Sequence, residues 1–384
     1  MSKPQRCGET HLDENNLKPN LFEKILEGFR KQGYAVDIIH DANINSKLRG
    51  VVIKARKRRG VTIYLSPLPD LRGQSRLSVI KLGGGSVIER FMHTKLPPRS
   101  AEDIVCPHFL ELKWAYGCPF NCSYCYLQGT LRLLPTQKKP MIKEREKVRR
   151  HLLDFLEAPL KEPEILNSGE LCDSLMYEKT EFSITKNIAP LFEEKSLNRT
   201  GHKILIVTKS DRIEELLKLS ENKHVVVSFS INTPQASKRW EKGAADPLSR
   251  ISAARLLYEA GFEVRVRIDP IIPYPHASWI KEYCNLVDKI FGQLWPSRIT
   301  LGSLRGLSTT IRKTWDKSWL IYLEEQSRWG LRPNHKIRYE AYRMLIDYMD
   351  NEYGFSRVAL CKEPVRMWRN LGLDWKMCRC NCTW

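Results

Sequence analysis

The sequence predicts an α/β protein built on a partial (β/α)6 TIM-type barrel, with an N-terminal α+β lobe and a Cys-rich C-terminal extension. Two observations support this fold. Val- and Ile-rich runs alternate with amphipathic helical stretches from residue 109 onward, which is typical of parallel strands covered by helices. Six such units fit a partial barrel better than a complete eight-unit one. We expect the three parts to span residues 1–105, 106–305 and 306–384.

The N-terminal part begins with a helical pattern over residues 21–31. Short β-type runs follow at residues 35–40, 51–55, 61–65 and 77–82. The triplet Gly83-Gly84-Gly85 is interpreted as a hairpin turn. A phosphate-binding loop is the alternative, but no Lys-Ser/Thr follows and no helix pattern begins there.

The central part supplies the barrel units in order. We expect strands over residues 110–116, 163–166, 203–209, 225–232, 263–269 and 298–301, and helices over residues 145–156, 188–194, 213–219, 248–259 and 279–293. In such barrels the chemistry lies at the carboxyl ends of the strands. The extension that follows is rich in Trp and Arg, and a helical pattern covers residues 336–350.

Composition limits the function classes. In 384 residues no stretch of about 18 apolar residues occurs, and the polar N-terminus lacks a signal-type apolar region, so we expect a cytoplasmic protein with no membrane partner. Eleven cysteines form an odd, clustered set, which favours metal ligands and reactive thiols over disulfides. Three of them, Cys7, Cys106 and Cys284, have no partner spacing, and Cys284 fits a helix core.

The net charge of +19 favours polyanionic partners: nucleic acid, an acidic macromolecule or a membrane surface. Basic clusters occur at residues 54–59 and 138–150, and tryptophans lie among Arg and Lys in the last third: Trp315, Trp319, Trp329, Trp368 and Trp375. Phosphate contacts beside aromatic rings suit a nucleic-acid groove. A solvated basic helix face with core tryptophans is the alternative.

The string Cys118-Pro-Phe-Asn-Cys122-Ser-Tyr-Cys125 is the strongest chemical signal in the chain. Three thiolates at this spacing can ligate three irons of a 4Fe-4S cluster and leave the fourth iron open. A zinc knuckle with a fourth ligand from elsewhere is the alternative.

This spacing, with Tyr124 before the last cysteine, resembles the cluster loop of the radical S-adenosylmethionine (SAM) superfamily. The longer string from Tyr116 to Gln128 resembles the spore photoproduct lyase family in particular. The resemblance implies a barrel of the radical SAM kind, SAM on the open iron, and an electron donor such as flavodoxin or ferredoxin.

The resemblance also implies SAM-binding residues at the strand ends. Ser168, Gly169 and Glu170 match the superfamily's glycine-glutamate element, in which the glutamate accepts from the SAM amine. Lys209, Ser230 and Asn232 match lyase elements that surround SAM. For all of them, ordinary turn or barrel-rim roles remain open.

Two groups of cysteines leave the chemistry open. In the lyase family a cysteine after the second strand donates hydrogen, but here the aligned position is Glu170. Cys172, two residues later, is either a relocated donor or a small buried residue. Cys361, Cys378, Cys380 and Cys382 fit a structural zinc or second iron-sulfur site, a redox or hydrogen-donor thiol near the active site, or no special role. On an extended strand the last three would share one face.

The sequence therefore predicts a radical SAM enzyme that uses a 4Fe-4S cluster to cleave SAM, most simply for repair of a thymine-dimer photoproduct in DNA. One alternative keeps SAM cleavage and changes the substrate to an RNA base, a peptide or a small metabolite. The other is a nucleic-acid-binding protein whose cysteines hold structural metals.

Overall fold

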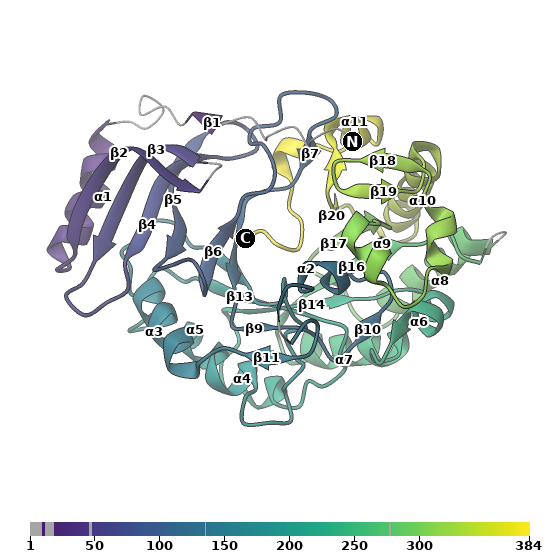
Figure 1. The fold of residues 1–384 in the computed structure, drawn as a ribbon. Coiled ribbons are helices and arrows are strands. Elements are labelled where there is room, and N and C mark those ends of the chain that lie inside the picture. Colours follow the sequence, from purple (N-terminus) through teal and green to yellow (C-terminus); the bar gives the residue numbers. More distant parts are fainter. Residues whose placement is uncertain (1–9, 12–18, 46–47, 135, 276–277) are drawn as a thin grey trace.

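The computed structural model describes residues 10–11, 19–45, 48–134, 136–275 and 278–384. Within these residues one mixed sheet of 13 strands runs through the molecule, in the order β1-β3-β4-β5-β6-β8-β12-β13-β14-β16-β17-β20, with β2 beside β3. The sheet curves around the centre of the molecule, and most of the helices lie on its outer side (Figure 1).

The first half of the sheet is antiparallel from β2 to β8, and helix α1 packs against it through Leu26 and Phe29. Gly83 and Gly85 have positive φ values of 54° and 77° in the turn between β5 and β6, which confirms the hairpin interpretation. The elements of this part are β1 (Thr10–His11), α1 (Pro19–Lys31), β2 (Ala35–Asn45), β3 (Leu48–Arg56), β4 (Ile63–Pro69), β5 (Ser75–Leu82), β6 (Ile88–Phe91) and β7 (Ile104–Val105).

The second half of the sheet is parallel from β8 to β20. Every residue of β14 is buried, because helices cover one side of this sheet and inward-facing side chains fill the other. Its strands are β8 (Phe109–Leu112), β12 (Ile165–Asn167), β13 (Lys203–Thr208), β14 (Val225–Ser230), β16 (Glu263–Ile271), β17 (Ile299–Ser303) and β20 (Val358–Leu360). Separate two-stranded antiparallel sheets are formed by β9 (Ala115–Tyr116) with β11 (Met141–Ile142), β10 (Asn121–Cys122) with β15 (Glu241–Lys242), β18 (Glu325–Ser327) with β19 (Gly330–Arg332), and β21 (Glu363–Pro364) with β7.

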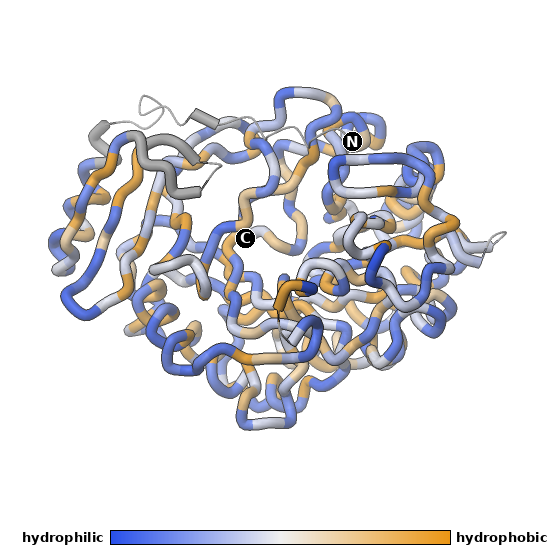
Figure 2. The backbone as a smooth tube through the Cα atoms, viewed as in Figure 1, coloured by the Kyte–Doolittle hydropathy of each residue, from blue (hydrophilic) through white to orange (hydrophobic). Residues whose placement is uncertain are grey.

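Helices connect these strands, and hydropathy alternates along them as expected for an outer layer (Figure 2). They are α2 (Leu127–Thr130), α3 (Arg145–Leu156), α4 (Ile184–Asn187), α5 (Ala189–Glu193), α6 (Pro234–Trp240), α7 (Pro247–Glu259), α8 (Trp279–Phe291), α9 (Ser308–Lys313), α10 (His335–Tyr353) and α11 (Val365–Asn370). The helix expected over residues 213–219 is only a 3-10 turn, Leu216–Lys218, in which Leu216 is the buried residue.

The large sheet continues from the central part of the chain into both the N-terminal and the C-terminal parts. Strand β6 pairs with β8, and β20 from the extension pairs in parallel with β17. The C-terminal segment then returns to the middle of the molecule, inside the curve of the sheet (Figure 1). Among the helices of the described ranges, none is long and apolar enough to cross a membrane.

Candidate active site

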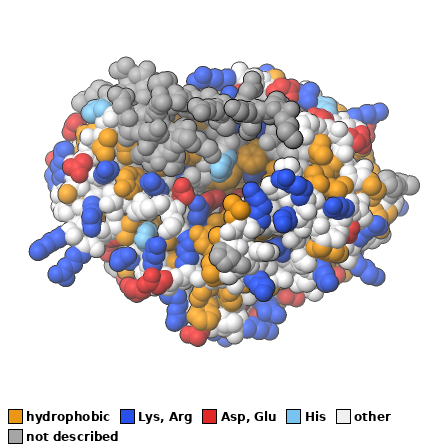
Figure 3. All heavy atoms as spheres, viewed as in Figure 1, with side chains coloured by type: hydrophobic (Ala, Val, Ile, Leu, Met, Phe, Trp, Pro, Cys, Tyr) orange, Lys and Arg blue, Asp and Glu red, His pale blue; other side chains and the backbone are white. Residues whose placement is uncertain are grey.

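A cavity of about 520 Å³ lies where the parallel strands end. Its walls include the residues that follow β8, β12, β13 and β16, together with Phe91 from the N-terminal part and Trp329 from the extension. Basic side chains are spread over the face shown in Figure 3, and several lie beside the hollow at its centre. All three parts of the chain therefore contribute to one site.

The loop that carries Cys118, Cys122 and Cys125 is held in place by its backbone. Gly117 has φ +79°, and a Cβ there would lie 2.2 Å from the carbonyl oxygen of Lys139, so only glycine fits. The Cys118 amide donates to the Lys138 carbonyl at 2.9 Å, and the Lys138 ammonium donates to the Phe120 carbonyl. Strand β10 pairs with β15, which fixes the far side of the loop.

The three loop cysteines fit an iron-sulfur cluster by the chemistry of the donor set. All three are free thiols, and all three line the cavity. Burial raises the pKa of Cys122 to about 12 and raises that of Cys125, while Lys209 opposes both shifts. Such thiols lose their protons when a metal replaces them, which is the usual route to thiolate ligation.

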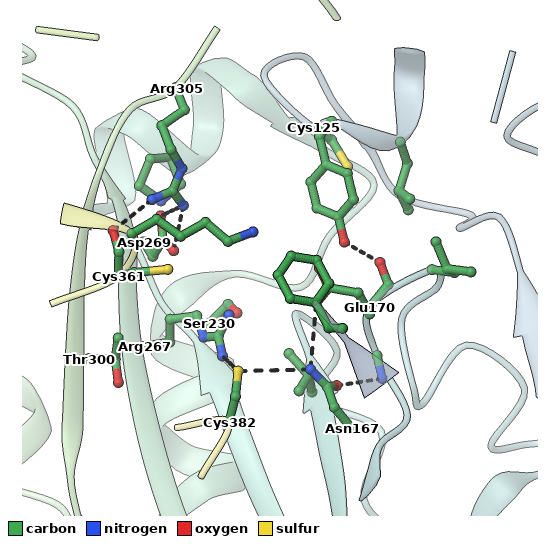
Figure 4. A pocket seen from close by; sticks show the side chains of 18 of the residues that line it. Cys125, Asn167, Glu170, Ser230, Arg267, Asp269, Thr300, Arg305, Cys361 and Cys382 are labelled. Atoms are coloured by element: carbon green, nitrogen blue, oxygen red, sulfur yellow. Dashed lines mark hydrogen bonds and ion pairs between the residues drawn. The ribbon is translucent and has the colours of Figure 1, made fainter. Parts of the chain in front are cut away.

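Most residues expected to bind SAM line the same cavity: Tyr124, Gly169, Glu170, Lys209 and Ser230. A Cβ on Gly169 would lie 2.6 Å from the Cβ of Val207, so this turn also requires glycine. The Glu170 carboxylate faces the cavity (Figure 4), where Asn167 Nδ2 lies 3.5 Å from its Oε2.

The buried carboxylate of Glu241 fixes side chains in the cavity wall beside the cysteine loop. It accepts hydrogen bonds from Lys209 Nζ at 2.8 Å, from Arg250 Nη2 at 2.6 Å and from the Tyr124 hydroxyl. Burial opposes ionisation, but the charges of Lys209 and Arg250 prevail and hold the pKa of Glu241 well below its ordinary value. Tyr124 and Lys209 are thereby fixed beside the cysteine loop.

Two expected site residues have side chains that do not line the cavity. Ser168 Oγ lies 2.8 Å from both Ser174 Oγ and the Leu205 carbonyl oxygen. Asn232 donates to the Pro270 carbonyl at 3.1 Å and accepts from the Tyr283 hydroxyl at 2.7 Å. Both side chains form hydrogen bonds within the protein, outside the cavity lining, and so stabilise the strand ends.

Cys172 lines the cavity and is buried. Its thiol donates to the Ser168 carbonyl at 3.3 Å, and burial raises its pKa well above the ordinary value. Of the cysteines without partner spacing in the sequence, Cys106 is buried and also lines the cavity, and Cys284 on α8 packs against the core while half-buried. Cys7 lies outside the described residues.

The C-terminal cysteines divide into two groups. Cys361, Cys380 and Cys382 line the cavity, whereas Cys378 is not among its lining residues. Cys361 hydrogen-bonds to Asp269, while the thiols of Cys378, Cys380 and Cys382 are hydrogen-bonded in series. Residues 380–383 form a turn closed by the Thr383 amide and the Cys380 carbonyl at 3.1 Å, not an extended strand. In the described ranges, no three His, Cys, Asp or Glu side chains are arranged to hold a single metal ion.

The expected tryptophan groove is also divided. Trp319 and Trp368 are core residues, Trp315 is exposed, and Trp329 lines the cavity. The Lys362 ammonium lies 4.3 Å from the centre of the Trp329 ring. Trp319 and Trp368 thus fit the core alternative, and Trp375 packs against the core, while a nucleic-acid groove stays a prediction.

Sequence reasoning missed three charged cavity residues, Glu111, Arg267 and Arg305, whereas Asp269 stands at the end of the fifth expected strand, where the chemistry is expected. Arg305 holds Asp269 through two hydrogen bonds of 2.7 and 2.8 Å. Burial and then the charge of Glu170 raise the pKa of Glu111 to about 7. A signal existed for Arg267 and Asp269, because charges at every second position of an otherwise apolar strand must share its inner face.

Known proteins agree with this arrangement. The family model for spore photoproduct lyase matches residues 109–302. The spore photoproduct lyase of Clostridium acetobutylicum is 26% identical over 206 residues, covering 53% of this chain and 58% of that protein. The Bacillus subtilis lyase is 30% identical over 182 residues, covering 47% of this chain and 50% of that protein. The chain thus spans about half the length of these curated relatives.

A solved structure of spore photoproduct lyase complexed with dinucleoside spore photoproduct has a similar fold. It superimposes with a TM-score of 0.54 at 20% identity, covering 65% of this chain and 75% of that chain. Another, with bound AdoMet and dinucleoside spore photoproduct, gives a TM-score of 0.54 at 19% identity over 68% of this chain and 79% of that chain. Since the family model spans half of the sequence, from β8 to β17, the chain belongs to the spore photoproduct lyase family.

Proposed function

We propose that this protein is a radical SAM enzyme that repairs a thymine-dimer type photoproduct in DNA. The observation that carries the proposal is the meeting of Cys118, Cys122 and Cys125 with Gly169, Glu170 and Lys209 around one cavity. The curved parallel sheet then serves as a partial (β/α)6 barrel of the radical SAM kind.

Cys118, Cys122 and Cys125 would hold the 4Fe-4S cluster, and Tyr124, Glu170, Lys209 and Ser230 would surround SAM. When bound, the cluster supplies the electron that cleaves SAM to a 5′-deoxyadenosyl radical. The Glu170 carboxylate would accept hydrogen bonds from the SAM amine. Ser168 and Asn232 act indirectly, because their hydrogen bonds set the positions of the strand ends.

DNA is the proposed partner, and flavodoxin or ferredoxin the proposed electron donor. The surplus of positive charge attracts phosphates, and a lesion must leave the duplex to reach a cavity of this kind. The ring of Trp329 beside Lys362 offers a stacking surface for an extruded base.

The test is anaerobic reconstitution with iron and sulfide, followed by dithionite and SAM, with and without DNA carrying the spore photoproduct. We expect 5′-deoxyadenosine to form and the lesion to disappear. Alanine at Cys118, Cys122 or Cys125 should remove the broad visible absorbance of the cluster and SAM cleavage. Cys284→Ala, on α8 away from the cavity, is the matched control and should retain both.

A second candidate keeps the radical chemistry on an RNA base, a peptide or a small metabolite. It is favoured by the three extension cysteines in the cavity wall, which lie beyond the family match. Formation of 5′-deoxyadenosine without loss of the lesion would support it. A colourless protein that cleaves no SAM and binds nucleic acid would instead support structural metal sites in a binding protein.

A further inference from the structure

The end of the chain forms part of the cavity wall. Cys380 and Cys382 line the cavity together with the three loop cysteines. Figure 4 shows the Cys382 sulfur between the side chains of Asn167 and Arg267, facing the same space as Glu170 and Ser230. The family match ends at residue 302, so it assigns these cysteines no role.

Asn381 fixes this segment against three neighbouring strands. Its Nδ2 donates to Ser228 Oγ at 2.7 Å and to the Val266 carbonyl at 3.0 Å. Its Oδ1 accepts from Thr300 Oγ1 at 2.7 Å, and its backbone amide donates to the same oxygen at 2.9 Å. The side chain is fully buried, so the flanking cysteines are held at defined positions inside the sheet.

Arg265 also holds this turn, through hydrogen bonds to its backbone. Its Nη1 donates to the carbonyls of Asn381 and Thr383 at 2.8 and 2.6 Å. A buried guanidinium that lost both backbone acceptors would cost free energy, because its donors would be left without hydrogen bonds. The turn is therefore a rigid part of the fold.

The Cys382 thiol lies next to polar groups on one side and another thiol on the other. Arg267 Nη2 lies 3.2 Å from its sulfur, and Asn167 Nδ2 lies 3.8 Å from it. Cys380 hydrogen-bonds to it and also to Cys378, so three thiols lead from the cavity toward the exterior. Cys378 is half-buried at the outer end.

We propose that Cys382 donates a hydrogen atom to a carbon radical formed in this cavity, and that Cys380 restores it. The inference rests on the proposed radical function. In the first step the S–H bond of Cys382 breaks and a C–H bond forms, which leaves a thiyl radical. The thiyl then takes a hydrogen atom from Cys380, and a one-electron reductant with one proton returns Cys380 to a thiol.

Hydrogen-atom transfer from the Cys382 thiol to a carbon radical is thermodynamically favourable, because an S–H bond is weaker than an aliphatic C–H bond. Three of the other cavity thiols have partners that are not thiols. Cys172 donates to the Ser168 carbonyl at 3.3 Å, Cys361 hydrogen-bonds to Asp269, and Cys106 lies 3.8 Å from the Pro107 carbonyl oxygen. Cys382 and Cys380 both line the cavity and hydrogen-bond to each other, so a second thiol stands next to the first.

The experiment is SAM cleavage by the reconstituted protein in D2O with dithionite as reductant and no DNA. Exchangeable S–D groups then label the 5′-deoxyadenosine, and mass spectrometry measures the labelled fraction. We expect most of the wild-type product to carry one deuterium. Cys382→Ala and Cys382→Ser should each lower the labelled fraction at least fivefold, with cluster absorbance unchanged.

Three matched variants separate the candidates. Cys378→Ala, Cys172→Ala and Cys361→Ala should keep the wild-type labelled fraction. An unlabelled wild-type product, or a labelled fraction unchanged in both Cys382 variants, would overturn the proposal. Absence of 5′-deoxyadenosine from all variants would instead overturn the proposed function.

A second measurement needs no cluster. Treatment of the metal-free protein with diamide should join Cys380 and Cys382 in a disulfide, identified by peptide mapping, and Cys378→Ala should not prevent it. Asn381→Ala, which frees the turn, should lower the yield of this disulfide several-fold. Failure of the wild-type pair to cross-link would contradict the proposed transfer between the two thiols, whatever the outcome with SAM.

Discussion

Gly169 shows how one residue sets the shape of the cavity. A Cβ there would lie 2.6 Å from the Cβ of Val207 and 2.9 Å from its carbonyl oxygen, so the turn that carries Glu170 would have to move. We predict that Gly169→Ala lowers the free energy of unfolding by about 1–3 kcal/mol, measured by urea denaturation.

The control is Gly84→Ala, because a Cβ at Gly84 meets nothing within 4 Å. It should leave stability within about 0.5 kcal/mol of wild type. Equal effects of the two substitutions would show that the close approach of Val207 carries no strain.

Glu178 makes stability depend on pH. Burial raises its pKa to about 7, and its carboxylate accepts from Ser183 Oγ at 2.9 Å at the start of α4. A raised carboxyl pKa means that the folded state binds the proton more tightly, so stability is lost as pH rises from about 4.5 to about 7. We predict that Glu178→Gln, which cannot ionise, is more stable than wild type at pH 8 by up to about 3 kcal/mol.

Urea unfolding at pH 5 and pH 8 measures this difference. The advantage of Glu178→Gln should be small at pH 5 and grow with pH. Glu352→Gln, at an exposed position, is the control and should give the same small difference at both pH values. An advantage of Glu178→Gln that does not change with pH would rule out ionisation of Glu178 as the cause.

Among the elements of the fold, β21 carries Glu363, whose carboxylate links β19 and α10 of the C-terminal part to β17. Its carboxylate is fully buried and forms ion pairs with Arg332 of β19 and Arg338 of α10. It also accepts from the Tyr342 hydroxyl at 2.8 Å and from Ser303 Oγ at 3.1 Å. We predict that Glu363→Gln costs about 3–5 kcal/mol of stability, because two buried guanidinium groups lose their counter-charge.

Chemical denaturation again provides the measurement. The matched control is Asp347→Asn, which breaks the exposed ion pair with Arg343 on α10 and should cost less than about 1 kcal/mol. A cost of that size for Glu363→Gln would mean that the extension is held by its apolar contacts instead.

For the molecule as a whole, we predict that the net charge of +19 makes the proposed binding of DNA sensitive to salt. With two or more phosphate contacts, affinity for duplex DNA should fall at least about tenfold between 50 and 200 mM salt. Arg58 and Arg59 are exposed in the turn between β3 and β4. We predict that replacing both with Ala lowers the slope of log affinity against log salt, measured by fluorescence anisotropy.

Arg255→Ala, in an exposed ion pair on the outer helix α7, is the control and should leave the slope unchanged. An affinity that does not respond to salt would exclude phosphate contacts as the basis of binding.

The parallel βα pattern, the loop of Cys118, Cys122 and Cys125, and the family could all be predicted from the sequence, because they depend on local spacing and periodicity. Helix α3 begins and ends where its apolar pattern predicts, at Arg145 and Leu156. The Gly83–Gly85 hairpin likewise follows from local backbone preferences.

Which distant residues share the cavity could be seen only in the folded structure. Cys382 lies beside Asn167 and Arg267, which are 215 and 115 positions away along the chain, and no local pattern carries that distance. Buried hydrogen bonds of Asn381 across β14, β16 and β17 hold it there. Ser168 and Asn232 fit a motif, yet their side chains turn to internal partners because buried polar groups must find hydrogen bonds.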